Sequence, residues 1–314
     1  MVTTNAMGSN PAQQAWPELV YRDWRDTYDT LHLYLQMAGK VKLELCPFLN
    51  QWWEVALQVS ARGITSGPIP WRASTFDIEF DFIDHRVVIR SSNGQSKALP
   101  LTSVPVAEFY QRFMAALDSL GIEVRITTMP SEIPDAIPFD SDTIHASYDG
   151  EYASRWWQIA LATERVINQF RTPFHGKSSP VNLFWGAFDL SHSRFNGEPA
   201  ETSPAADRMM RYGENEANFA VGFWPGGEAA EAAFYAYMTP APAGIEDAQI
   251  EPQSAQYVPA MGEFFLPYEA ARRDAAPEEA VLTFFQSSYD ACANLAGWNR
   301  AALEGDVPQL ERTG

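Results

Sequence analysis

The chain has 314 residues, of which 46% are hydrophobic, enough to bury a large core. Its formal net charge of −18 argues against a general nucleic-acid-binding protein and against docking on anionic membrane, because both need a basic surface. Net charge alone does not exclude a local basic pocket.

The ends of the chain and its cysteines indicate a cytoplasmic protein. Residues 1–15 lack the basic and apolar regions of a signal peptide, so we expect a disordered leader there, and a tail over 305–314. The two cysteines, Cys46 and Cys292, lie far apart without metal-ligand spacing, which favours reduced, buried thiols over a disulfide. No run of eighteen apolar residues is present that would span a bilayer.

The first half of the chain, about residues 16–130, shows helical and then strand periodicity. Apolar residues at helical spacing predict a helix over 22–38 that Gly39 ends, followed directly by a strand over 40–45. A second amphipathic helix is predicted over 104–120. Further strands are expected at 52–62, 75–83, 86–92 and 123–126.

After a proline-rich connector, residues of about 150–304 repeat this order. A long helix is predicted over 151–171, and a helix over 277–298 with proline near its first turn closes the half. Apolar or alternating segments between these helices predict strands at 181–190, 218–224, 233–238 and 262–268.

In both halves a predicted helix stops at a Gly-Lys pair and passes into a strand. The chain holds four lysines against eighteen arginines, so the pairs Gly39-Lys40 and Gly176-Lys177 favour an internal duplication. The alternative is coincidence, because glycine and lysine are both common at helix ends.

These patterns predict an α+β fold. We expect one compact module over 16–304 that consists of antiparallel sheet from two related helix–four-strand–helix halves, with helices packed on the sheet. A cleft is expected near the axis that would relate the halves.

Acidic residues alternate along the predicted strand over 75–83. The side chains of Asp77, Glu79 and Asp81 lie on one face, where they either hold a metal or pair with the next strand. If the hairpin turns at His85 and the residue before it, Glu79 faces Arg90 while apolar residues share the other face. This register favours a charge-paired face, so no metal site is predicted.

Residues 181–190 are apolar on both faces, which predicts a buried central strand. Asp189 stands where this core ends, and a buried carboxylate needs a partner. Lys177 and Arg194 are the nearby cations in the sequence. Asp189 therefore belongs either to a structural ion pair or to a pair that orients a ligand.

Familiar catalytic motifs are missing. HGKSS resembles the end of a phosphate-binding loop, but Arg171 stands where that loop needs glycine, and the order is helix then strand. Ser178 and Ser179 lie in no nucleophile motif, and no metal-ligand spacing occurs. Catalytic residues and cofactor therefore stay unassigned. His32, on a helix, is more often a core histidine than a ligand.

Ten tryptophans, several beside glycine or proline as in GFWPGG, predict an aromatic-lined cleft. Most buried rings belong to the core, so we expect the cleft where rings and charged groups meet. The candidate ligand-binding residues are Lys40, Arg62, Lys177, Trp185, Asp189, Arg194 and Trp224.

Long motifs of this sequence resemble one family. HLYLQMAGKVKLEL, ARGITSGPIP, HASYDGEY, GKSSPVNLFWGAFDLSHSRF and FYAYMTPAP are similar to the uncharacterised bacterial domain-of-unknown-function family numbered five-nine-nine-six. The resemblance runs from about Trp16 to Glu304 and implies a single full-length module of the bacterial cytosol. It implies no particular activity and no catalytic residue.

The leading hypothesis is the binding of a small anionic or aromatic molecule in the cleft, where Lys40 and Lys177 would converge. The second is an enzyme that uses Asp189 or His32 as acid or base in the same cleft. The third is a scaffold or oligomerisation module, which would expose an apolar patch in place of a pocket. Neither nucleic acid nor membrane is an expected partner, and the oligomeric state stays open.

Overall fold

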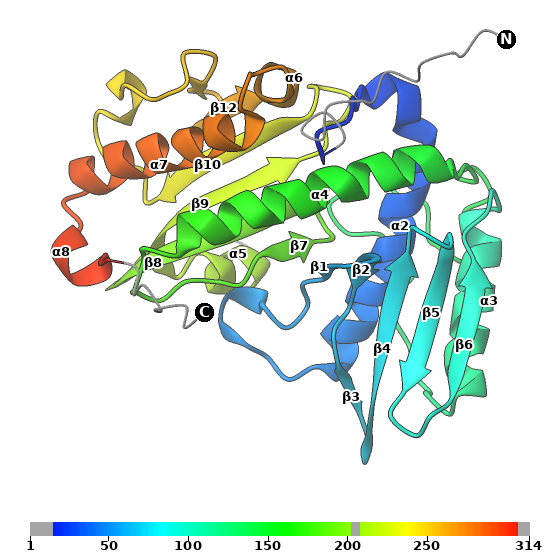
Figure 1. Cartoon of the computed structure of the whole chain (residues 1–314). Coiled ribbons are helices and arrows are strands. Elements are labelled where there is room, and N and C mark those ends of the chain that lie inside the picture. The colour runs from blue at the N-terminus through cyan, green and yellow to red at the C-terminus, as the bar shows by residue number, and fades with distance from the viewer. Residues whose placement is uncertain (1–14, 202–207, 307–314) are drawn as a thin grey trace, which may run out of the picture.

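A computed structural model describes residues 15–201 and 208–306, which form two six-stranded antiparallel sheets and the helices that cover them (Figure 1). This arrangement confirms the expected α+β class. The predicted leader over 1–15 and tail over 305–314 fall almost entirely outside the described residues.

The first half begins with a long helix, forms the first sheet and ends with a second helix. Strands lie in the order β1-β2-β4-β5-β6, and β3 pairs with β4. Figure 1 shows this sheet in cyan, with α2 in blue and α3 behind it. The elements are α2 (Tyr21–Leu45), η1 (Asn50–Trp52), β1 (Gln58–Ser60), β2 (Gly63–Thr65), β3 (Ile69–Trp71), β4 (Ser74–Asp81), β5 (Arg86–Ser91), β6 (Ser96–Pro100) and α3 (Val106–Ser119).

The second half begins with α4, forms a six-stranded sheet in place of the four strands expected, with α5 between β8 and β9, and ends with α6, α7 and α8. The order is β11-β12-β10-β9-β8-β7. That the halves arose by duplication stays a prediction. The elements are α4 (Gly150–Arg171), β7 (Asn182–Phe184), β8 (Asp189–Pro199), α5 (Arg208–Gly213), β9 (Glu216–Trp224), β10 (Ala233–Thr239), η2 (Ile245–Asp247), β11 (Gln256–Val258), β12 (Glu263–Pro267), α6 (Tyr268–Arg272), α7 (Pro277–Leu295) and α8 (Arg300–Leu303).

Helix α2 does not end at Gly39, and the strand predicted over 40–45 is wrong. The helix continues to Leu45 because residues 40–42 are buried on it. Lys42 Nζ donates a hydrogen bond to the carbonyl of Ser66 at 2.7 Å, so its charged end is satisfied inside the protein. Gly39 is a contact residue: an added Cβ would lie 2.1 Å from Trp185 Nε1. The two Gly-Lys pairs are therefore not equivalent helix ends.

The central strand predicted over 181–190 is in fact a hairpin. Strands β7 and β8 pair antiparallel, and residues 185–188 turn between them, with Phe188 at a φ of 63°. The turn is apolar because it is buried: the Phe188 ring stacks on His32 at 4.8 Å and on Trp156 at 4.7 Å. The continuous apolar run at 181–190 therefore arises from a buried turn between two strands, and not from one strand that is buried on both faces.

Two other predicted strands, at 52–62 and 123–126, form only in part or not at all. Only residues 58–60 of the segment 52–62 form a strand, since the chain first makes the short helix η1. Val124 and Ile126 bury alternate side chains in the segment 123–126, yet this extended segment pairs with no strand among the described residues.

The acidic strand β4 pairs with β5 two residues out of the predicted register. Asp77, not Glu79, lies opposite Arg90, because the turn holds four residues instead of two. Arg90 Nη2 still donates to both carboxylates, at 2.5 Å to Asp77 and 2.6 Å to Glu79. His85 lies in this turn, with a φ of 49°. No group of three metal-ligating side chains exists in the described part of the chain.

Helix α4 connects the two sheets. It contacts β1 and β2 of the first sheet, β8 and β9 of the second, and α7 beside it. Figure 1 shows α4 in green and α7 in orange lying side by side across the second sheet. Within the described ranges, no helix is long and apolar enough to cross a membrane.

Candidate functional site

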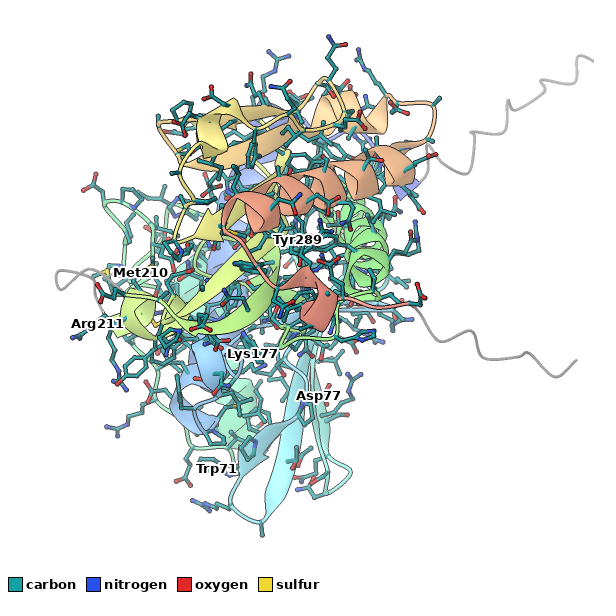
Figure 2. All side chains as sticks on the ribbon, turned by 90° about the vertical axis from the view of Figure 1, so that its left-hand side faces the viewer. Trp71, Asp77, Lys177, Met210, Arg211 and Tyr289 are labelled. Atoms are coloured by element: carbon teal, nitrogen blue, oxygen red, sulfur yellow. The ribbon has the colours of Figure 1, made fainter. Side chains whose placement is uncertain are left out.

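The two faces of the second sheet have different surroundings. Alternation directs Phe219 and Phe234 toward the helices, where their rings meet Tyr289 at 5.4 Å and Phe285 at 6.1 Å, respectively. Figure 2 labels Tyr289 on α7. The alternate residues of the same strands, such as Asn218 and Tyr235, point to the opposite face, which neither α4 nor α7 covers. That second face forms the wall of a cavity.

The cavity has a volume of about 870 Å³. Its wall consists of alternate residues of β8 to β12, and its rim comes from η1, the connector residue Glu132, α5 and the loop 229–232. Aromatic rings dominate the apolar part of the lining: Trp52, Trp53, Phe184, Phe195, Trp224, Tyr235, Tyr237 and Phe265. Carboxylates and small polar groups make up the rest, notably Glu132, Ser179, Asp189, Ser191, Ser193, Glu214, Asn218, Glu231 and Glu263.

Asp189 is one of two strongly perturbed acids of the cavity. The Tyr235 hydroxyl donates a hydrogen bond to Asp189 Oδ2. Burial, opposed in part by this hydrogen bond and reinforced by Glu132, raises the pKa of Asp189 from 3.8 to about 6. The tyrosine crosses the strand between them at Gly222, where an added Cβ would lie 2.3 Å from Tyr235 Cζ. Glycine is therefore required at this position for the pair to meet.

A second carboxylate and a second tyrosine line the same face. Burial and the negative charge of Asp189 raise the pKa of Glu263 to about 7. Tyr237 stacks beside Tyr235 at 6.1 Å, and its hydroxyl lies 3.4 Å from Glu214 Oε1. The cavity thus holds acids that keep or release a proton close to neutral pH, which suits proton transfer or the binding of a cation.

The rim near η1 has a strained backbone. Gln51 and Trp52 have φ values of 52° and 62°, in the left-handed region that costs non-glycine residues about 1 kcal/mol or more. Trp52 Nε1 donates to the carbonyl of Met209 at 3.0 Å, which ties η1 to α5. Figure 2 shows Met210 and Arg211 of α5 at the outer edge of the molecule.

Two buried amide oxygens face this cavity without a partner. Asn218 and Gln51 line it with exposed fractions of 2% and 8%, and neither Asn218 Oδ1 nor Gln51 Oε1 meets a donor among the described residues. A buried acceptor without a donor is rare in folded proteins, so both oxygens are free to accept a hydrogen bond from a molecule in the cavity.

Of the seven predicted site residues, Asp189 and Trp224 line the cavity. Lys177 borders it from outside: its Nζ is 2.5 Å from Glu216 Oε2 and 4.4 Å from the centre of the Phe195 ring. Arg194 lies on the helix face, because it follows Asp189 by five positions along β8 and alternation puts residues at an odd spacing on opposite faces. The predicted pair of these two residues therefore does not form.

Arg194 is a core residue. Its guanidinium lies 3.5 Å from the centre of the Phe170 ring and 4.3 Å from that of Tyr289, and it donates to the Phe170 carbonyl. Burial lowers its pKa to about 10, so it remains charged at neutral pH.

The remaining candidates lie elsewhere. Lys40 Nζ donates to Ser131 Oγ at 3.0 Å, and Trp185 Nε1 donates to the Val55 carbonyl at 2.9 Å. Arg62 belongs to the first sheet, where it binds Asp81 at 2.8 Å. Lys40 and Lys177 do not converge on the cavity.

His32 is buried and supports the β7–β8 turn. Its Nε2 lies 2.7 Å from the Trp185 carbonyl and 3.1 Å from that of Gly186. Burial lowers its pKa to about 4, so at neutral pH it donates an Nε2–H hydrogen bond as a neutral ring. It does not line the cavity, which leaves Asp189 as the better acid–base candidate.

Sequence comparison places this architecture in a family. Residues 16–305 match the family of unknown function DUF5996. The chain belongs to DUF5996. The match covers nearly the whole chain and confirms the resemblance seen in the motifs. No curated protein and no solved structure matches it.

The sequence analysis of this DUF5996 chain missed Gln51, Glu132, Asn218, Tyr235 and Glu263. Three of these belong to β9, β10 and β12, whose alternation was recognised. Asking which alternate residues are polar would have found Asn218, Tyr235 and Glu263. Gln51 and Glu132 come from irregular segments of the first half and the connector, where no sequence period indicates a shared cavity.

Proposed function

We propose that this protein binds a small organic molecule with an aromatic or apolar body in the cavity of the second sheet. The observation that carries the proposal is an 870 Å³ cavity whose wall combines aromatic rings with convergent polar groups. Volumes of about 300–1,000 Å³ with this mixture are typical of small-molecule sites. The acidic charge of the chain supports the exclusion of nucleic acid and anionic membrane as partners.

Filling the cavity tests the proposal. Ser193 lies on its wall, so Ser193→Trp is expected to abolish the binding of aromatic fragments found by ligand-observed NMR on the wild-type protein. Lys97→Ala is the control, because Lys97 is exposed on β6 of the first sheet and lies outside the lining, and it should leave binding unchanged. Equal binding to wild type and Ser193→Trp, with both folded by circular dichroism, would place the site elsewhere.

A catalytic role for the same cavity is the second candidate. It is supported by the hydrogen-bonded pair of Asp189 and Tyr235, because an acid with a pKa of about 6 can exchange protons with a bound molecule at neutral pH. Incubating each bound fragment with the protein and following it by NMR separates the two functions: a binding protein returns the fragment chemically unchanged.

A further inference from the structure

The charge of the cavity indicates the class of ligand, and this inference rests on the proposed function. We propose that the cavity takes an organic cation with N–H donors, such as a protonated amine or a guanidinium, carried on an aromatic or apolar body. This reverses the anionic ligand that the sequence favoured, because the lysines and arginines that suggested it do not line the cavity.

The first argument is the balance of charges. Five carboxylates line the cavity, and no lysine or arginine does so in the described ranges. The cations that come near are already engaged: Lys177 binds Glu216, and Arg208 lies 5.6 Å from the centre of the Trp52 ring at the rim. A negative ligand would meet repulsion and few charged donors, whereas a cation would meet attraction from several directions. The five are Glu132, Asp189, Glu214, Glu231 and Glu263.

The second argument is independent of charge and concerns hydrogen bonding. Asn218 Nδ2 donates to Glu214 Oε2 at 2.7 Å and to the Glu216 carbonyl at 3.1 Å. Both partners only accept, so the orientation of the amide is fixed and its oxygen is the atom left without a donor. Gln51 Nε2 donates to Asn215 Oδ1 at 2.9 Å, and Gln51 Oε1 has no partner in the described part of the chain. A ligand with N–H groups would satisfy both oxygens.

The third argument is the kind of apolar wall. Indole and phenol rings attract cations through their negative faces, and Trp53, Trp224 and Tyr235 line the cavity together with the carboxylates. The raised pKa values of Asp189 and Glu263 agree with this inference, because negative charge in the empty cavity is disfavoured and a bound cation would relieve that cost.

Compounds that share one ring system and carry side chains of similar size but different charge test the inference. Tryptamine, 3-propylindole and indole-3-propionate share the indole ring system and are cationic, neutral and anionic; corresponding sets on phenyl and naphthyl rings extend the test. By calorimetry and NMR at about pH 8, we expect the cation of at least one set to bind about tenfold or more tightly than its neutral partner, and the anion not to bind.

Variants connect this preference to the carboxylates. Asp189→Asn should weaken binding of the cation about tenfold and leave the neutral compound unaffected, and Glu263→Gln is the second variant with the same expectation. Glu246→Gln, which removes an exposed charge outside the lining, is the control and should change neither.

The outcomes separate the two proposals. If neutral or anionic members bind as tightly as the cations, or if both variants keep full affinity for the cation, the ligand class is wrong while the binding function stands. If no member of any set binds at millimolar concentration and the fragments also fail, the proposed function itself is overturned.

Discussion

Asp189→Asn is expected to make the empty protein more stable than wild type at about pH 8, by about 1–3 kcal/mol. The folded protein binds the Asp189 proton more tightly than the unfolded chain does, because the pKa rises from 3.8 to about 6 on folding. Ionisation of the carboxylate above that range therefore destabilises the fold. The lower end of the estimate reflects the partial access of Asp189 to the cavity.

The difference in free energy of unfolding between Asp189→Asn and wild type should depend on pH, because only wild type carries the titrating carboxyl. The advantage of Asp189→Asn should be largest above about pH 6, decrease as the pH falls from about 6 to 4, and vanish by about pH 3, where Asp189 of wild type is protonated in both the folded and the unfolded state. The asparagine oxygen still accepts from Tyr235, so the fold is retained.

Urea denaturation at several pH values measures this difference. Glu246→Gln serves as the control for a general change in net charge, since its side chain is exposed, and it should show no comparable gain. An Asp189→Asn variant that is less stable than wild type at about pH 8 would show that the carboxylate supports the fold and would remove the argument that a ligand relieves its charge.

Gly39→Ala is expected to destabilise the protein by about 2–3 kcal/mol. In an ordinary helix interior this change stabilises by up to about 1 kcal/mol, because glycine is a poor helix former. Here the added methyl group would lie 2.1 Å from Trp185 Nε1 and within 2.3 Å of neighbouring indole atoms. The indole cannot move without losing its hydrogen bond to the Val55 carbonyl.

A double-mutant cycle identifies the cause. Trp185→Phe shortens the ring, so Gly39→Ala should cost less in that background than in wild type, as measured by urea denaturation. Gly213→Ala is the matched glycine control, since nothing lies within 4 Å of its added Cβ, and it should be close to neutral. Equal costs in both backgrounds would contradict the proposed clash.

The sequence predicted the elements that are long and strictly periodic. Helices α3, α4 and α7 and strands β9, β10 and β12 follow the apolar spacing of the sequence. The failures are segments in which lysines or turn residues are buried. Helix α2 buries Lys40 and Lys42 as well as its apolar residues, and the turn before β8 is buried beneath His32 and Trp156.

The candidate site was predicted only in part, for a related reason. Asp189 and Trp224 could be chosen because one ends an apolar run and the other precedes a turn. The cations chosen with them satisfy contacts that the fold creates: Lys177 with Glu216, Arg194 with the rings of Phe170 and Tyr289. Nothing local in the sequence indicates which face of a strand a helix will cover.

Helix α4, which packs against both sheets, limits where the chain can be divided into parts that fold alone. Since α4 packs against strands of both sheets, a gene split in the connector would leave the first sheet without one of its walls. The products of such a split should not fold alone, and the intact chain should melt in a single calorimetric step. If the predicted duplication occurred, an ancestral half that folded separately would have needed a second copy of itself to supply that wall.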